Sequence, residues 1–436
     1  MTLPARGVAS GAVPISGVGI VSVPWWREPT RDQWLAWVAG WLGWMLDAFD
    51  FTIFLLLLDP ISREFHVPLT AAAVVVTLTL WMRLIGACAS GWLADRVGRR
   101  TPLMISIAWF SACQFIAGFS PNFTFLLVMR TLLGIGMGGE WPAGAALAME
   151  SWPSRSRGRM GALLQGSWAL GYVLACVAYG ALVDRIGWRA LFWIGVLPAL
   201  LIIYIRGFVK EPDVWIENRR QQIEAKREVR SPLIRIFRSP LRGNTVTASL
   251  WVISGFISYY AINALFASHL QRNLHFTAAQ VMFTIAASQL VCVFANGLWG
   301  ALSDKLGRRW CGIIPAAISI PVAALYLTTN DPVIVTIGFI IQGVFGQPAT
   351  WLFPVYLTER FPTEVRGAAT AFCYHSGAIV GGMIPPVITL MASHNNMGLA
   401  TAMLIWTAVG GASYAVALFL GPETKGTVLR AELALT

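Results

Sequence analysis

Long apolar runs separated by short polar segments make up most of the chain between residues 34 and 420. A helix needs roughly 20 apolar residues to cross a hydrocarbon core of about 30 Å. Runs of that length predict twelve membrane-spanning helices, at residues 34–58, 69–93, 102–120, 123–147, 160–183, 189–209, 245–270, 277–301, 311–328, 332–356, 368–393 and 398–420. The pattern therefore predicts an all-α, multi-pass membrane protein.

Composition and charge support the same class. Of the 436 residues, 56% are hydrophobic and 12% are charged, whereas soluble domains carry about 25% charged residues. The net charge of +11 does not indicate a nucleic-acid partner, because its placement follows the predicted spans. With both termini cytoplasmic, external loops hold only four of the 32 Lys and Arg residues, namely Arg63, Arg185, Arg189 and Arg272. This asymmetry is the positive-inside pattern of a protein of the cell (inner) membrane.

Three further features of the sequence narrow the possible partners, cofactors and targeting signals. The basic segment at residues 219–242 is expected to face anionic lipid, with binding of a partner as the alternative. The six cysteines lie singly, without CxxC spacing, so we expect no disulfide framework, metal site or cofactor. The first 30 residues lack the pattern of a cleavable signal peptide.

A repeat divides the chain into two halves. "GWLADRVGRR" at residues 91–100 recurs as "GALSDKLGRR" at 300–309, a shift of 209 residues. "ESWPSRSRG" at 150–158 recurs as "ERFPTEVRG" at 359–367, with the same shift. The repeat predicts two parallel six-helix bundles, at 34–209 and 245–420, joined by a cytoplasmic loop at 210–244 and flanked by cytoplasmic segments at 1–33 and 421–436. Such halves are typical of secondary transporters with a midplane site between them.

The repeated loops predict a cytoplasmic gate. An Asp at a helix end, beside a tight Gly turn and an Arg pair, can make charge-assisted contacts to neighbouring helix ends. These contacts would hold the gate shut and break when the halves rock; the alternative is that the basic loops merely set topology. The predicted gate residues are Gly91, Asp95, Arg96, Gly98, Arg99, Arg100, Glu150 and Arg157 in the first half, and Asp304, Lys305, Gly307, Arg308, Arg309, Glu359 and Arg366 in the second.

These motifs carry a family resemblance. The repeated loop and "RTLLGIGMGGE" at residues 130–140 resemble motifs of the major facilitator superfamily. Within it, "WLGWMLDAFDF" and "GIGMGGEWPAGAALAMESWP" are similar to the sialate:proton symporter group, which includes sialic-acid transporters and lactate and pyruvate permeases. The resemblance implies twelve helices in two pseudo-symmetric bundles, and a monomer that carries a small organic anion with protons.

Five ionisable residues interrupt the predicted spans: Asp47, Asp50, Arg83, Arg130 and Glu140. Each costs about 2.5–3.5 kcal/mol at a helix centre, so they must be paired, hydrated or protonated. Depth along the spans suggests that Asp50 pairs with Arg130, and Arg83 with Glu140. Asp47 and Asp50 share one helix face, and two carboxylates so close do not both ionise cheaply. We therefore expect Asp47, Asp50, Arg130 and Glu140 to couple transport to protons.

The repeat shows that these buried charges occur in the first half only. Advanced by 209 residues, the five positions become Phe256, Tyr259, Cys292, Phe339 and Ala349, none of which is charged. The asymmetry favours a coupling site in the first half, although a structural Arg83–Glu140 salt bridge would look the same. Arg83 or Arg130 is the expected guanidinium partner of a carboxylate, and the sequence does not choose between them. Expected uncharged contacts in the second half are Tyr259, Tyr260, Asn263, Gln289, Asn296, Gln342, Gln347, Trp351, Tyr374 and His375.

These residues together predict an importer of a small organic anion, a carboxylate such as sialate, lactate or pyruvate, by proton symport with alternating access. Importing a monovalent anion against a negative interior costs about 2.3 kcal/mol per 100 mV, and one proton cancels that charge. A proton-coupled exporter of drugs or metabolites is one alternative. A sugar or polyol carrier is another, because "GPETKG" at residues 421–426 resembles a sugar-porter motif. An enzyme or ATP-driven pump is not expected, since no GxxxxGK[ST] phosphate loop occurs.

Overall fold

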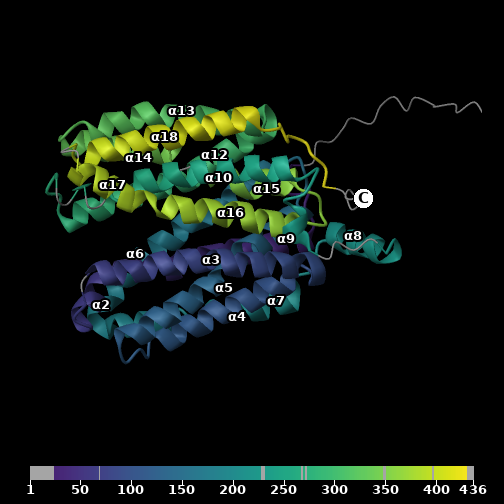
Figure 1. The fold of residues 1–436 in the computed structure, drawn as a ribbon, viewed down its shortest axis with the longest axis horizontal. Helices are drawn as coiled ribbons and strands as arrows, with labels where there is room; N and C mark the ends of the chain where they lie inside the picture. Colours follow the sequence, from purple (N-terminus) through teal and green to yellow (C-terminus); the bar gives the residue numbers. More distant parts are fainter. Residues whose placement is uncertain are drawn as a thin grey trace, which may run out of the picture.

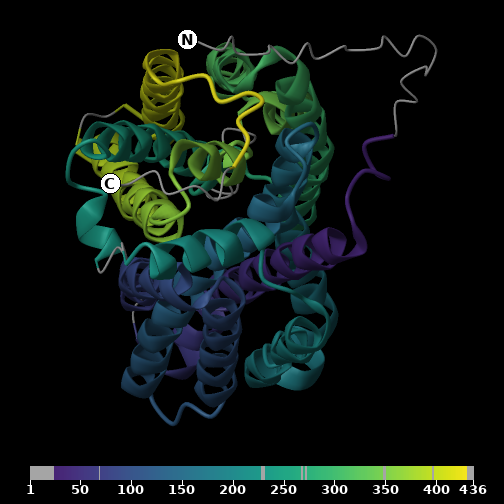
Figure 2. The ribbon, with the colours of Figure 1, turned by 90° about the vertical axis from the view of Figure 1, so that its right-hand side faces the viewer.

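The computed structural model describes residues 24–67, 69–226, 231–266, 269–270, 273–346, 350–394 and 397–429. These residues form long helices that run side by side, and none of them forms a strand (Figure 1). The helices before residue 209 form one bundle, and those after residue 241 lie beside it as a second (Figure 1, Figure 2). One hydrophobic cluster spans both bundles, and further clusters lie within each of them.

The first bundle contains the helices α1 (Arg31–Leu56), α2 (Leu58–Glu64), α3 (Leu69–Val97), α4 (Arg100–Ala117), α5 (Phe123–Ser151), α6 (Arg157–Ile194) and α7 (Ala199–Phe208). The α6 range covers the fifth predicted span and the start of the sixth, two helical segments that meet at a kink at Gly187, whose φ is 75°. Glycine adopts this conformation without steric cost. Pro198 precedes α7 and interrupts the sixth span, because proline lacks the N–H that a continuous helix needs.

The segment between the bundles contains α8 (Asp213–Glu224) and α9 (Pro232–Arg235). The second bundle contains α10 (Arg242–Asn263), α12 (Ala278–Leu306), α13 (Arg308–Leu327), α14 (Pro332–Phe345), α15 (Phe353–Arg360), α16 (Arg366–Gly382), α17 (Ile384–His394) and α18 (Leu399–Leu420). The tenth predicted span is divided between α14 and α15, and the eleventh between α16 and α17, near Pro385 and Pro386.

Ten helices in the described part of the chain are long and apolar enough to cross a membrane. The remaining two predicted spans are the 18-residue helix α4 and the divided tenth span. The predicted fold of twelve membrane-spanning helices in two bundles is therefore confirmed.

Close contact between α3 and α5 positions the charged residues of the first bundle. A Cβ atom on Gly86 would overlap the carbonyl of Ile135, and one on Gly138 would overlap the carbonyl of Arg83. Small residues let helix backbones approach closely where no hydrophobic effect drives association. The glycines therefore bring the backbone that bears Arg83 directly against the one that bears Glu140.

Candidate functional site

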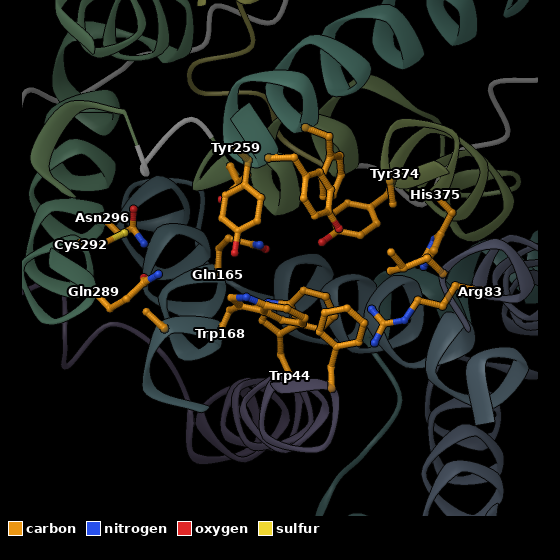
Figure 3. A pocket seen from close by; sticks show the side chains of 17 residues that line it. Trp44, Arg83, Gln165, Trp168, Tyr259, Gln289, Cys292, Asn296, Tyr374 and His375 are labelled. Atoms are coloured by element: carbon orange, nitrogen blue, oxygen red, sulfur yellow. The ribbon is translucent and has the colours of Figure 1, made fainter. Parts of the chain in front are cut away.

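A pocket lies between the two bundles (Figure 3). Helices α1, α3 and α6 supply one wall, and α10, α12 and α16 supply most of the other. Its lining comprises Trp44, Phe51, Leu80, Arg83, Gln165, Trp168 and Ala169 from the first half, and Phe256, Tyr259, Tyr260, Gln289, Cys292, Asn296, Thr350, Tyr374, His375 and Ala378 from the second.

The repeat relates one wall of the pocket to the other. The 209-residue shift pairs Phe51 with Tyr260, Leu80 with Gln289, Arg83 with Cys292, Gln165 with Tyr374, and Ala169 with Ala378, and all ten line the pocket. Equivalent positions on the two halves therefore face each other across it. The pocket lies where the halves are expected to be related by their pseudo-twofold axis.

Aromatic rings make up much of the lining. The Trp44 ring lies 4.8 Å from that of Trp168 and 6.0 Å from that of Tyr374, centroid to centroid. Tyr374 in α16 also stacks on Trp141 in α5, with centroids 3.7 Å apart. The Trp141 indole N–H donates to Gln165 Oε1 at 3.2 Å. This aromatic contact joins the two halves beside the pocket.

Arg83 is the single Lys or Arg among the pocket-lining residues that the structure describes. Its Nη2 donates to Asp47 Oδ1 at 2.7 Å, and its guanidinium lies 5.3 Å from the centre of the Phe51 ring. Asp47 is fully buried, and its Oδ2 has no hydrogen-bond partner among the described residues. Arg83 therefore pairs with Asp47. Depth along the helices had suggested Glu140 instead, but depth does not specify the direction of a side chain.

Glu140 lies at the crossing of α1 and α5. Its carboxyl group is fully buried, and neither oxygen has a hydrogen-bond partner within the described part of the chain. A Cβ atom added to Gly144 would lie 3.3 Å from Glu140 Oε1, and a Cβ atom added to Gly43 would overlap the same oxygen. A carboxylate in such a place would be strongly destabilised, so the geometry suits a protonated acid.

Asp50 and Arg130 form a second buried group, and Arg130 does not line the pocket. Arg130 Nη1 donates to Gln114 Oε1 at 2.6 Å, and the guanidinium lies 4.1 Å from the centre of the Phe54 ring. Asp50 lies close enough to interact electrostatically with Arg130, but no ion pair joins them among the described contacts, and both Asp50 oxygens lack hydrogen-bond partners there. Of the two arginines predicted to bind substrate, only Arg83 reaches the pocket.

The predicted contacts in the second half divide into two groups. Tyr259, Tyr260, Gln289, Asn296, Tyr374 and His375 line the pocket. Asn263, Gln342 and Trp351 do not: Asn263 donates to the Tyr259 carbonyl at 2.9 Å, and the other two are buried in helix packing. Gln347 lies outside the described residues.

Sequence reasoning missed Trp44, Gln165 and Trp168. Gln165 could have been found by moving the candidate Tyr374 back by 209 residues. The two tryptophans carried no such signal, because this apolar chain contains 20 tryptophans.

The predicted gate residues gather at one end of the molecule. Arg99 contacts Asp95 at 2.8 Å and Glu150 at 2.9 Å. The Asp95 carboxylate accepts hydrogen bonds from the backbone N–H groups of Gly367 at 2.9 Å and Ala368 at 3.0 Å. Asp95 of the first half thus caps the N-terminus of α16 in the second half, where a negative charge is favourable.

The second half repeats this arrangement. Arg308 contacts Asp304 at 2.7 Å and Glu359 at 3.1 Å. Asp304 accepts from the N–H groups of Gly158 at 2.8 Å and Arg159 at 3.0 Å, so it caps α6 of the first half.

Ion pairs also cross between the halves, but they are unequal. Glu150 lies 2.7 Å from Arg366, whereas its counterpart Glu359 lies 3.5 Å from Arg157.

Two further acids, which the sequence analysis missed, complete the gate. Glu211 accepts from the N–H groups of Arg99 and Arg100 at the start of α4. Glu423 accepts from those of Arg308 and Arg309 at the start of α13. They follow the sixth helix of each half and are 212 residues apart, so a search at 209 alone does not find them.

The remaining gate residues fit around these contacts. Gly98 and Gly307 have φ values of 107° and 105°, which only glycine adopts readily. A Cβ on Gly91 would come within 2.6 Å of the Gly367 carbonyl oxygen. The Arg96 guanidinium lies 4.5 Å from the centre of the Trp92 ring, and the Lys305 carbonyl accepts from Lys425. The structure is therefore closed at this end.

Comparison with known proteins agrees with the fold. The family described as Major Facilitator Superfamily matches residues 40–260 and 248–433. A protein of Cupriavidus pinatubonensis described as a probable 4-methylmuconolactone transporter is 32% identical over 93% of this chain and 94% of its own length. A cis,cis-muconate transport protein of Acinetobacter baylyi is 28% identical over 85% of this chain and 90% of its own.

The predicted resemblance to sialic-acid transporters is also confirmed. The sialic acid transporter NanX of Escherichia coli is 27% identical over 95% of this chain and all of its own length. The solved structure of the proton:xylose symporter XylE superposes with a TM-score of 0.74 at 17% identity, covering 91% of this chain and 98% of XylE, which shows a shared fold. The chain belongs to the major facilitator superfamily and is a multi-pass membrane transporter.

Proposed function

We propose that the protein imports a small organic anion together with protons, in the cell (inner) membrane and with both termini cytoplasmic. The observation that carries the proposal is the Arg83–Asp47 ion pair, whose guanidinium lines the pocket between the halves. A guanidinium binds a carboxylate through two parallel hydrogen bonds. A neutral sugar or polyol offers no charge to such a group, so this pair favours an anion.

The pair also suggests how proton and substrate are linked. While Asp47 is ionised, it occupies a donor of Arg83 at 2.7 Å. Protonation of Asp47 removes that charge and leaves Arg83 free for the substrate carboxylate. Each event then favours the other, because linkage between two bound species is reciprocal. Glu140 and Asp50, which have no hydrogen-bond partner in the described residues, are further candidates for holding the proton.

The gate fits the same cycle. To open the cytoplasmic side, the protein must remove Asp95 from the start of α16 and Asp304 from the start of α6. Both losses expose helix N–H groups that need a new partner such as water. A rocking motion of the halves, with the protein acting as a monomer in the bilayer, accounts for alternating access to the pocket.

The relatives support an organic anion without identifying it. Muconate, sialic acid and niacin, after which three of the transporters similar to this chain are named, are all carboxylic acids. Sialate, lactate and pyruvate remain members of the proposed substrate class.

Uptake into proteoliposomes tests the proposal. We expect a carboxylate to accumulate when the interior is made alkaline, and the accumulation to disappear when a protonophore collapses the gradient. A panel of sialate, lactate, pyruvate, muconate and aromatic carboxylates identifies the substrate. Accumulation that requires ATP, or no accumulation of any carboxylate, would refute the proposal.

A further inference from the structure

The two ends of the pocket differ in charge. Arg83, from α3, lies at one end (Figure 3), and Gln289, Cys292 and Asn296, from α12, lie at the other. Asn296 is 3% exposed, and its Oδ1 has no hydrogen-bond partner in the described part of the chain. The pocket therefore offers a cation at one end and neutral amides at the other.

The walls between these ends are largely ring faces. Trp44 and Trp168 lie along one side in Figure 3, and Tyr259 and Tyr374 lie along the opposite side. The Trp44 and Trp168 rings are already packed against each other, with their centroids 4.8 Å apart. Rings stack best on other flat π-systems, so this slot favours a flat ligand over a puckered one.

The charges decide how many carboxylates fit. Among the described residues of the lining, Arg83 is the single guanidinium and none is a Lys. A second carboxylate at the amide end would lose its hydration and find no cation in return. A hydroxyl, carbonyl or ring oxygen there can instead form hydrogen bonds with Gln289 and Asn296. Sites built this way reject the wrong group because their polar atoms and those of the ligand remain unpaired.

We propose that the transported anion is a flat, conjugated monocarboxylate with a neutral hydrogen-bonding group at the end opposite its carboxylate. Gln289 and Asn296 determine this specificity by binding the neutral group and rejecting a second carboxylate. The inference rests on the proposed function, because it assigns the carboxylate to Arg83. It goes beyond that function by setting the shape and charge of the rest of the molecule.

Three compounds with one six-membered ring each test the inference by competition in a proteoliposome counterflow assay. They are 4-hydroxybenzoate, which is flat with a neutral end, terephthalate, which is flat with a second carboxylate, and trans-4-hydroxycyclohexanecarboxylate, which is puckered. We expect 4-hydroxybenzoate to compete at least about tenfold better than either of the others. The same comparison with 4-hydroxycinnamate and 4-carboxycinnamate shows whether a longer ligand is preferred.

A charge-gain variant provides the sharper test. Gln289→Lys supplies the missing cation, so it should raise competition by terephthalate and lower that by 4-hydroxybenzoate. Gln289→Leu is the matched control, because leucine is the residue at the equivalent position 80 in the first half. This control should weaken competition by 4-hydroxybenzoate without strengthening competition by terephthalate. Asn296→Lys provides a second charge-gain variant.

The outcomes separate this inference from the proposed function. Equal competition by all three compounds, or terephthalate competing best in the wild type, overturns the inference while leaving a carboxylate transporter. Transport of sialate or lactate with no competition by any flat acid also overturns the inference and leaves a carboxylate transporter. A protein that transports no carboxylate at all refutes the proposed function instead.

Discussion

The charges at the gate and the charges inside the first bundle are arranged in opposite ways. At the gate, both halves contribute, and Asp95, Glu150, Asp304 and Glu359 all bind guanidinium or backbone N–H groups. The charges inside the first bundle have no charged equivalents in the second half. The Asp50 and Glu140 carboxyl oxygens there have no hydrogen-bond partner among the described residues. Paired charges can hold a closed state together, whereas a carboxylate that is buried without a partner is costly, so such an acid is a candidate for holding a proton. The comparison therefore contrasts paired charges that occur in both halves with buried acids that occur in one half only.

Removal of the pocket cation should have the largest effect. Arg83→Gln deletes the carboxylate partner, so we expect uptake to fall by about 100-fold or more. It also leaves Asp47 buried without its cation, which lowers the melting temperature. The double variant Arg83→Gln with Asp47→Asn should recover melting temperature but not transport. Transport that also recovers in the double variant would mean that Arg83 serves the fold and not the substrate.

Asp50→Asn should separate proton coupling from substrate binding. We expect exchange of internal for external substrate to persist, because Asp50 does not line the pocket. Accumulation driven by a pH gradient should be lost, because asparagine cannot carry a proton. The control is Tyr259→Phe at the equivalent position in the second half, which should weaken binding but keep accumulation. Gradient-driven accumulation in Asp50→Asn would exclude Asp50 from coupling.

The matched gate variants Glu150→Gln and Glu359→Gln measure how symmetric the clamp is. Each removes one carboxylate from two buried guanidinium groups, those of Arg99 and Arg366 or those of Arg308 and Arg157. Breaking a buried ion pair in this way costs roughly 3–5 kcal/mol. Glu150→Gln should destabilise the closed gate more, because Glu150 contacts Arg366 at 2.7 Å, whereas Glu359 lies 3.5 Å from Arg157. Labelling of a single engineered cysteine in the pocket from the gate side reports the effect. Equal labelling of the two variants would contradict the asymmetry.

Substitution of Glu211 should have the smallest effect, and that effect is on stability. Burial raises the pKa of the Glu211 carboxyl above its usual value, against the lowering effect of the Arg99 and Arg100 N–H groups. Because the folded state then binds a proton more readily, this contribution to stability is present at low pH and is lost as pH rises through the raised pKa. Glu211→Gln should cost about 1 kcal/mol or less. Melting curves from pH 4.5 to 7.5 should show a larger deficit for the variant at the acidic end.

Much of the fold could be predicted because its signals can be read directly along the sequence. Apolar length indicated the spans, and a shift of 209 residues indicated which loops would meet, including Asp95 and Asp304. The breaks near Pro198 and Pro385 were missed, because apolar length does not register a lost backbone N–H.

The site was less predictable because it depends on side-chain direction. Position along a helix placed Arg83 level with Glu140, but the Arg83 side chain turns toward Asp47 on α1. Similarly, Arg130 and Arg83 look alike in sequence, but the Arg130 guanidinium packs on Phe54 and does not line the pocket. The azimuth of a residue around its helix, and the rotation of that helix in the bundle, are set by tertiary packing.

The reciprocal capping at the gate has an evolutionary consequence. Asp95 caps a helix of the other half, and Asp304 caps the equivalent helix in return. A twofold homodimer makes each of its contacts twice in this way. Two identical six-helix subunits facing each other would form the same closure, so one mutation in such a subunit would have strengthened both contacts at once. In one chain that carries both halves, the equivalent positions can change independently, and Arg83 in the first half is matched by Cys292 in the second.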